Sequence, residues 1–378
     1  MLKHDQFLAH QARTGCVEVN GRDDDKVTLA SDESWRRDAQ AVLKAYALDV
    51  VNITPITQGL VNLTLKLTSR HGERFALQRL HPIFGPGVNH NLERVTAHLA
   101  ARGMLTPRLV RNRDGALAVE HDGARWRMLS WIEGRAFDFL AQPAQAAQAG
   151  ALLARFHGLL ADFAETLIIE RAPIHEFARH RARLAAAQQE APVHRLRDDV
   201  ARAVDQLDAM RSAYAAPRGT PARLVHGDPK ISNVLFDEAG SQALCLVDLD
   251  TLAHMALPLE LGDALRSWCN PRREDDQAAR FEMALFAAAV DGYGAAARNF
   301  ITTDEVAALV PATFEIYLEL AARFLVDALE ECYFGWDAAR YDSRGAHNLA
   351  RARGQLSAAT SLLAQRATAE DAVLNAFG

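Results

Sequence analysis

The sequence predicts an α+β protein in which a small β-rich N-terminal part precedes a larger and mostly helical C-terminal part. Two observations point to this class. Short β-like runs fill residues 51–134, and alanine-rich stretches with apolar residues at helical spacing fill most of the chain after Gly134. At 378 residues the chain exceeds one average domain, so two lobes that share a cleft are expected.

The N-terminal part begins with a polar, aperiodic segment. Residues 1–30 carry an acidic run at 23–25 and are predicted to form a flexible leader. Helix-capping residues at 31 and 32 then precede the amphipathic stretch WRRDAQAVLKAYAL. Three β-like runs follow, then a helix that ends at Gly103, and then further strand-like runs. We therefore expect residues 31–134 to form a five-stranded antiparallel sheet with one main helix.

The C-terminal part, residues 135–378, is predicted to be helical apart from short strand-like segments around residues 222–250. Helical spacing is clear in QPAQAAQAGALLARFHGLLADF, EFARHRARLAAAQQE and HRLRDDVARAVDQLDAM, and helices resume after residue 250. The chain therefore reads as a small α+β lobe joined to a large helical lobe.

Composition excludes several classes of function. A formal net charge of −6 and a pI near 6.2 argue against nucleic-acid binding, which needs a surface of uncompensated Lys and Arg. The cysteines lack the CxxC spacing of a zinc site. The N-terminal residues lack the apolar core of a signal peptide, and no later run is long enough to span a membrane. A cytoplasmic protein is expected.

The stretch LVHGDPKISNVLFD, residues 224–237, places polar residues between two apolar runs and so predicts a loop held by strand ends. Asp228, Asn233 and Asp248 offer three oxygen-bearing side chains for one place. Mg²⁺ takes hard oxygen ligands, usually one or two carboxylates plus phosphates, which Asn233 and Asp248 can complement. Asp228 would then be free to accept a proton from a substrate hydroxyl, and Lys230 would face the transferring phosphate.

The alternative interpretation is an Asx-rich turn in which Asp248 and Asp250 are solvated charges. His226 is predicted to orient the loop through hydrogen bonds and to take no part in chemistry. Asp250 has two open interpretations, because it could support the metal ligands from behind or cap the next segment.

The segment HGDPKISN followed by VDLD resembles the catalytic and metal-binding segments of the aminoglycoside phosphotransferase family. These are small-molecule kinases with the protein-kinase-like two-lobe fold. The resemblance covers roughly residues 35–365. It implies ATP and Mg²⁺ as cofactors, an ATP-dependent transfer to an alcohol group, and no nucleic-acid or membrane partner.

For the nucleotide, the resemblance implies a hairpin that covers ATP and a connection between lobes that binds the adenine edge. TQGLVNLTL, with Gly59 and Asn62, occupies the place of the hairpin. MLSWIEGR occupies the place of the connection, with Ser130 and Ile132 presenting main-chain groups to adenine.

The third strand departs from the protein-kinase pattern, which has a phosphate-binding lysine there. FALQR has Gln78 at this position and Arg79 next. Either residue contacts the phosphates differently, or their charge is neutralised by Lys230 and Mg²⁺. Glu93 on the following helix is the expected acidic partner, although a solvated helix charge is equally compatible with the sequence.

Three later segments, LELGDALRSW, RFLVDALEECYF and HNLARARGQL, resemble the bacterial N-acetylhexosamine 1-kinases, which phosphorylate the anomeric hydroxyl of an amino sugar. The resemblance implies that Arg323 and Tyr333 bind the sugar. Trp268 or Trp336 could stack against it.

Two other functions are also compatible with the sequence. An aminoglycoside kinase would need a carboxylate-rich cleft, to which Asp327, Glu330 and Glu331 could contribute. A nucleotide-binding regulator without turnover is supported by Gln78 alone.

Overall fold

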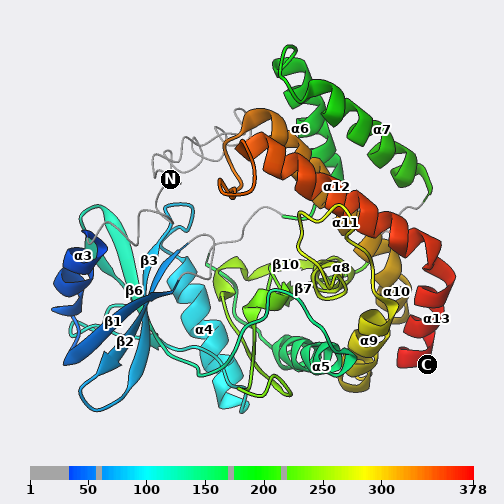
Figure 1. Ribbon diagram of the computed structural model, residues 1–378. Coiled ribbons are helices and arrows are strands. Elements are labelled where there is room, and N and C mark those ends of the chain that lie inside the picture. Colours follow the sequence, from blue (N-terminus) through cyan, green and yellow to red (C-terminus); the bar gives the residue numbers. More distant parts are fainter. Residues whose placement is uncertain (1–33, 57–61, 169–173, 214–218) are drawn as a thin grey trace.

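The computed structural model describes residues 34–56, 62–168, 174–213 and 219–378 (Figure 1). The predicted leader and Gly59 lie outside these ranges. A twisted sheet with one helix on each side forms one end of the molecule, and helices form the other. The predicted α+β class is confirmed.

The N-terminal part contains a six-stranded antiparallel sheet in the order β1-β2-β3-β6-β4, with β5 also paired to β6. The strands are β1 (Val50–Ile56), β2 (Leu63–Ser69), β3 (Arg74–Leu80), β4 (Leu109–Val110), β5 (Val119–His121) and β6 (Ala124–Ser130). The expected five strands were one too few. The outer edge of β6 accommodates two short strands, because β4 pairs near one end of β6 and β5 near the other.

Two helices cover this sheet, and they correspond to the amphipathic stretch after residues 31 and 32 and to the helix expected to end at Gly103. Helix α3 (Ser34–Leu43) packs Trp35 and Val42 against one face, together with Leu77 and Trp126 of the sheet. Helix α4 (Val88–Ala101) covers the other face and lies between the sheet and the helical part (Figure 1). The apolar core on the α4 side continues into the C-terminal helices.

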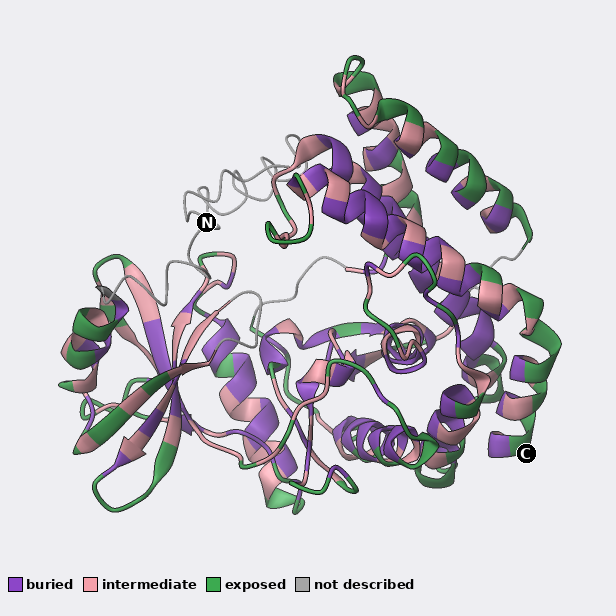
Figure 2. Cartoon of the chain, in the orientation of Figure 1, coloured by how far each residue is buried: buried purple, intermediate pink, exposed green. Residues whose placement is uncertain are grey.

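The C-terminal helices are α5 (Pro143–Leu160), α6 (Phe177–Glu190), α7 (Arg197–Ala213), α8 (Leu257–Trp268), α9 (Met283–Ala297), α10 (Thr303–Ala307), α11 (Leu309–Glu330), α12 (Arg344–Ala364) and α13 (Arg366–Phe377). Most of them pack against the long helix α11, whose residues are mostly buried (Figure 2), whereas α5 packs against α9. Glycines permit the closest approach between two of them. A Cβ at Gly292 of α9 would lie 2.0 Å from the carbonyl oxygen of Ala147 on α5.

Two small antiparallel ladders position the loops that carry the polar residues of LVHGDPKISNVLFD and VDLD. One joins β7 (Ala222–Val225) to β10 (Ala253–Ala256), and the other joins β8 (Val234–Phe236) to β9 (Ala243–Leu246). The first loop runs from β7 to β8 and the second from β9 to β10. Because both ladders end where these loops begin, residues 226–233 and 247–252 are brought side by side.

None of the helices in the described ranges has both the length and the hydropathy needed to cross a membrane.

Candidate active site

The loop between β7 and β8 gathers three of the predicted side chains. Lys230 Nζ lies 2.5 Å from Asp228 Oδ2. Asn233 Nδ2 donates to the backbone oxygen of Asp228 at 2.8 Å and to Oδ2 at 3.2 Å. Burial lowers the pKa of Lys230, but the carboxylates of Asp228, Asp248 and Asp263 outweigh it and hold that pKa above its usual value. Lys230 therefore remains a cation beside Asp228.

The second loop brings Asp248 to the same place. Val247 N–H donates to the backbone oxygen of Asn233 at 2.9 Å, so Asp248 follows directly on a residue paired with Asn233. Asp248 adopts the left-handed conformation, with φ 65° and ψ 49°, which is uncommon for a residue other than glycine. Burial and the nearby Asp250 carboxylate raise the pKa of Asp248, and Asp228 adds to this effect.

The chemistry of this donor set fits a divalent cation shared with phosphates. No group of three or more His, Cys, Asp or Glu side chains in the described ranges could hold a metal ion by itself. Asn233 and Asp248 instead offer one amide oxygen and one carboxylate, which is the incomplete oxygen set that Mg²⁺ typically uses with a nucleotide. A cation at this point would also offset the repulsion that raises the pKa of Asp248.

His226 and Glu260 support the two loops from the protein interior. Both are fully buried. The Glu260 carboxylate accepts the backbone N–H groups of His226 and Gly227, each at 3.0 Å. His226 Nδ1 accepts from Asp228 N–H at 3.3 Å, which assigns the ring proton to Nε2, 2.9 Å from the backbone oxygen of Val247. His226 thus joins the loop of Asp228 to the loop of Asp248.

Gly227 is required for the close approach of these loops. Its φ is 86°, and an added Cβ would lie 2.1 Å from the backbone oxygen of Thr251. We expect Gly227→Ala to destabilise the protein more than Gly115→Ala, which has a similar φ of 80° but open space around the Cβ position. The left-handed conformation costs both variants ~1–2 kcal/mol. Overpacking adds ~1–3 kcal/mol at Gly227 alone.

Urea unfolding of the two variants measures the difference. Equal losses of unfolding free energy would show that the contact with Thr251 relaxes without cost. That result would remove the steric argument for Gly227.

Helix α8 supports the loop that carries Asp228. This arrangement corrects the expectation for Trp268. Its side chain is 1% exposed and cannot stack on a sugar. The indole Nε1–H donates to the backbone oxygen of Pro229 at 2.9 Å, and Ser267 Oγ accepts from Ile231 N–H at 3.1 Å. Trp268 is therefore a support for the loop that carries Asp228.

Trp268→Phe tests this support, because it keeps an aromatic ring and removes the hydrogen bond to Pro229. We expect a loss of ~0.5–1.5 kcal/mol beyond that of the smaller ring, together with a reduced kcat. Trp126→Phe is the matched control, since Trp126 is also fully buried but its indole N–H has no hydrogen-bond partner in the structure. Equal losses in chemical denaturation would rule out a contribution from the hydrogen bond.

The position of the usual strand-three lysine is occupied by a different network. Gln78 Oε1 accepts from Arg127 Nε at 2.9 Å and from Nη2 at 2.7 Å. Arg127 also pairs with both carboxylate oxygens of Asp250. Asn62 donates to Asp250 at 2.9 Å and accepts from His81 N–H at 2.9 Å. Gln78 and Asn62, both predicted to bind nucleotide, therefore use their amides within the protein.

Arg79 and Glu93 do not form the expected partnership. Arg79 pairs with Trp126 in the sheet register, so it lies on the α3 face, opposite the face of Gln78 and Arg127. Glu93 Oε1 accepts from Arg111 at 3.0 Å. The residue of α4 that reaches the network is Asn89, one turn before Glu93. Strand alternation and helix phase direct these two side chains away from the network of Gln78 and Arg127.

The connection between the lobes presents one open segment of backbone. Ser130 is committed to pairing with Arg108, through its N–H at 2.8 Å and its Oγ at 2.9 Å. Ile132 lies beyond the end of β6, and within the described residues its backbone groups form no hydrogen bond. Glu133 is held by ion pairs with Lys66 and Arg74. Ile132 thus keeps free groups for an adenine edge, whereas the N–H of Ser130 does not.

The residues expected to bind the acceptor lie on α11 and in the loop between α11 and α12. Arg323 is half-buried, and its guanidinium carbon lies 5.7 Å from the ring centroid of Phe334. Within the described residues Arg323 forms no hydrogen bond or ion pair. Tyr333 is 57% exposed and packs edge-on against Phe334, with ring centroids 4.8 Å apart. Both residues remain available to a ligand.

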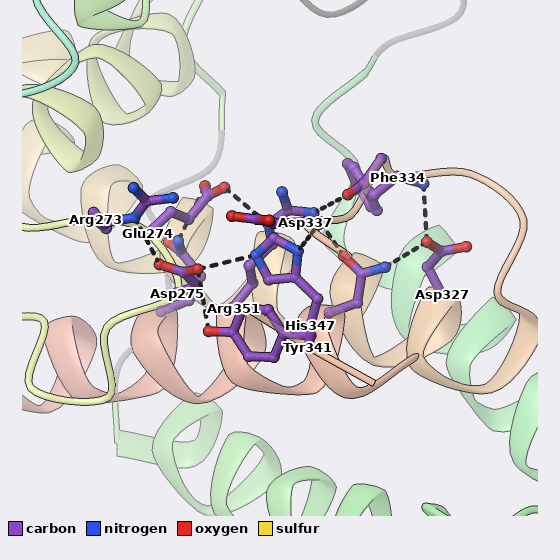
Figure 3. Close-up of polar contacts among 12 residues, drawn as sticks. Arg273, Glu274, Asp275, Asp327, Phe334, Asp337, Tyr341, His347 and Arg351 are labelled. Atoms are coloured by element: carbon purple, nitrogen blue, oxygen red, sulfur yellow. Dashed lines mark hydrogen bonds and ion pairs between the residues drawn. The ribbon is translucent and has the colours of Figure 1, made fainter. Parts of the chain in front are cut away.

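Asp327 fixes the shape of this loop (Figure 3). Its carboxylate accepts the backbone N–H groups of residues 332–334 at 2.7–2.9 Å and the side chain of Asn348 at 2.7 Å. Further along, His347 accepts from Asp337 N–H and contacts Asp275, which also accepts from Tyr341. The loop is therefore tied to α12 at both ends.

Residues 52–300 match the model of the phosphotransferase enzyme family. The chain belongs to this family. It is a small-molecule phosphotransferase that acts on a hydroxyl acceptor, and the family uses ATP and a divalent metal ion. Of the predicted resemblances, that to the phosphotransferase family is confirmed.

Among curated proteins, the chain is 28% identical to a homoserine kinase of Methylobacillus flagellatus over 232 residues, which are 61% of this chain and 68% of that protein. It is 29% identical to a homoserine kinase of Beijerinckia indica over 46% of this chain and 50% of that protein. These matches span between half and about two thirds of the length of the relatives.

Solved structures show the same protein-kinase-like fold. An aminoglycoside phosphotransferase from Alicyclobacillus acidocaldarius superposes with a TM-score of 0.58 at 20% identity, covering 88% of this chain and 96% of that one. An amicoumacin kinase in complex with AMP-PNP, Ca²⁺ and Ami gives a TM-score of 0.60 at 14% identity, covering 88% of this chain and 95% of that one.

Proposed function

We propose that the protein is an ATP-dependent kinase that transfers the γ-phosphate to a hydroxyl of a sugar, most simply the anomeric hydroxyl of an N-acetylhexosamine. Residues 31–134 would cover the nucleotide, and residues 135–378 would carry the catalytic and acceptor groups. The observation that supports the reaction is the meeting of Asp228, Lys230 and Asn233 beside the Asp248 loop, where two ladders end together.

The proposed roles of these residues depend on which of their side-chain oxygens form no hydrogen bond within the described residues. Asp228 uses Oδ2 for Lys230 and Asn233, while Oδ1 forms no hydrogen bond within the described residues. Oδ1 is thus available to accept the proton of an acceptor hydroxyl. The Asn233 side chain donates through Nδ2, and its Oδ1 accepts no hydrogen bond within the described residues. Asn233 and Asp248 would hold Mg²⁺, which when bound neutralises phosphate charge.

The charge of Lys230 would stabilise the phosphoryl group in transit. Its ammonium contacts Asp228 and lies within electrostatic reach of Asp248. A cation close to both the proposed base and the proposed metal ligand would stabilise negative charge on the transferring group.

The amino-sugar acceptor is supported by Arg323 and Tyr333. A half-buried guanidinium without an internal partner can donate two parallel hydrogen bonds to sugar oxygens. The exposed Tyr333 ring supplies an aromatic surface beside it. The tie of Asp327 to the backbone of residues 332–334 holds both groups in a fixed relation.

A hydroxy amino acid is the second candidate acceptor. The curated relatives are homoserine kinases, and the free guanidinium of Arg323 would pair with a carboxylate. His175 and Glu319 are paired at 2.9 Å one turn before Arg323 and form a buried support for that side.

A polycationic aminoglycoside is less well supported by the site. Asp327 is saturated by backbone N–H groups, Glu330 is paired with Arg183, and Glu331 lies 3.5 Å from Arg195. Burial also raises the pKa of Glu330 to about 7, which weakens its negative charge. These three carboxylates are therefore not free to bind ammonium groups.

An acceptor screen tests the proposal. ADP release is measured with N-acetylglucosamine, N-acetylgalactosamine, homoserine and an aminoglycoside, and products are examined by phosphorus and proton NMR. We expect turnover with an N-acetylhexosamine and phosphorus coupling to the anomeric proton. Turnover only with homoserine would replace the sugar proposal. ATP binding without turnover on any acceptor would favour a regulator.

A further inference from the structure

We infer that Arg127 is the positioning residue that compensates for the missing strand-three lysine. It acts by holding Asp250, and through it the loop of Asp248, against the N-terminal sheet. This inference rests on the proposed role of Asp248 as a metal ligand. The chain has Gln78 where protein kinases have the lysine that pairs with the phosphates and with the following helix, so that link is absent here. The sheet instead contacts the loop between β9 and β10, called the metal loop below because it carries Asp248, through Arg127 and Asp250.

The guanidinium of Arg127 has no free donor. Nε donates to Gln78, Nη1 donates to Asn89 at 3.2 Å and to Asp250 Oδ1 at 2.5 Å, and Nη2 donates to Gln78 and to Asp250 Oδ2 at 2.8 Å. These contacts use all five N–H groups of an arginine. A lysine could not form them, because its ammonium lacks the planar fork that grips a carboxylate with two bonds. Arg127 is therefore committed to the protein and positions other groups.

Burial makes this pair obligatory. The side chains of Arg127 and Asp250 are 2% and 0% exposed. Removing either partner leaves an uncompensated charge in the interior, which folded proteins tolerate poorly. The buried pair of Arg127 and Asp250 thus joins the N-terminal sheet to the metal loop, so we expect the two to move together.

Asp250 transmits this constraint to Asp248 over a very short path. A single 3-10 turn, Leu249–Thr251, follows Asp248 and contains Asp250. On the opposite side of that turn, Thr251 Oγ1 donates to the backbone oxygen of His226 at 2.9 Å. The left-handed conformation of Asp248 is therefore held from both lobes, as expected for a strained residue that its surroundings must maintain.

The hydrogen bonds of Arg127 connect several secondary-structure elements. Gln78 lies on β3 and Asn89 on α4, and both accept hydrogen bonds from Arg127 of β6, which in turn donates to Asp250. The lysine-to-glutamate pair of protein kinases joins the third strand to the following helix. Here the bond runs from the sheet directly to the metal loop. The geometry points to a metal affinity that depends on the placement of the small lobe.

The test uses a double variant that removes the charges together. Arg127→Met/Asp250→Leu leaves no unpaired charge and is the pair best able to fold. Nucleotide binding is followed by calorimetry with ADP at increasing Mg²⁺. We expect the half-saturating Mg²⁺ concentration to rise ~10–100-fold, the range for loss of a residue that orients metal ligands. ADP binding in excess EDTA should stay close to that of the wild type.

Two further variants keep the test decisive. Arg127→Lys and Asp250→Asn preserve size and should each give a smaller rise in the same Mg²⁺ requirement. They also serve if the double variant fails to fold. The control is Arg181→Met/Asp208→Leu, which removes another bidentate pair, between α6 and α7, and should leave the Mg²⁺ dependence unchanged.

A folded double variant, or folded conservative variants, with the Mg²⁺ dependence of the wild type would overturn the inference. The failure of the proposed function would look different. In that case the wild-type protein itself would bind ADP without any dependence on Mg²⁺.

Discussion

Asp228→Asn is expected to lower kcat by at least ~100-fold, the range for removal of a general base, while the affinity for ATP stays close to that of the wild type. Asn keeps the size of the side chain and can still accept from Asn233 Nδ2. What it loses is the charge that pairs with Lys230 and the oxygen that would accept a proton. Steady-state kinetics and nucleotide calorimetry on the same preparation separate the two effects.

Asp291→Asn is the matched control for this variant. Asp291 is an exposed aspartate on α9, outside the loops of the site. It should show wild-type kinetics. If Asp228→Asn retained a wild-type kcat, Asp228 would have no place in the mechanism.

Asp248→Ala is expected to abolish the Mg²⁺ dependence of nucleotide binding. The substitution removes the one carboxylate proposed to hold the metal and leaves only the amide oxygen of Asn233, which is too few protein oxygens for a stable Mg²⁺ site. Calorimetry with ADP in Mg²⁺ should then give the affinity that the wild type shows in excess EDTA.

Glu238→Ala provides the control for Asp248→Ala, because Glu238 is an exposed carboxylate in the turn of the same β8–β9 ladder. It should retain the full effect of Mg²⁺. Normal metal-dependent binding by Asp248→Ala would contradict the assignment of this residue as a ligand.

Local patterns predicted most of the fold. Period-two alternation marks residues 50–80 as strands, and helical spacing marks the long segments after Gly134. Strand-like runs cover all six strands, and the expected count of five was one too few because β4 and β5 are only two and three residues long. Whether such short runs form separate strands is decided by their pairing with β6.

Contacts within the site were likewise predictable only where the residues are close in the sequence. Asp228, Lys230 and Asn233 lie within six residues of one another, so a loop brings them together whatever the rest of the chain does. Arg127 and Asp250 are 123 residues apart, and their pairing was not predicted. One signal was present, because an arginine between the apolar residues of ARWRML on a central strand needs a buried partner.

Side-chain direction explains the other errors. Alternation along β3 already places Gln78 and Arg79 on opposite faces, so only one of them could face the cleft. The direction of the Trp268 side chain was harder to predict from the sequence, because a tryptophan at the end of a helix can face either solvent or the core. Here it faces the core, where Pro229 offers its backbone oxygen as a partner.

The most direct test of the central claim is a crystal structure with Mn²⁺ and a non-hydrolysable ATP analogue, in which anomalous scattering locates the metal. We expect a metal peak bound by Asn233 Oδ1 and Asp248, at distances near the ~2.1 Å typical of Mg²⁺ sites, with Asp228 outside the coordination sphere. A metal held by Asp228 alone, or located away from both Asn233 and Asp248, would contradict that claim.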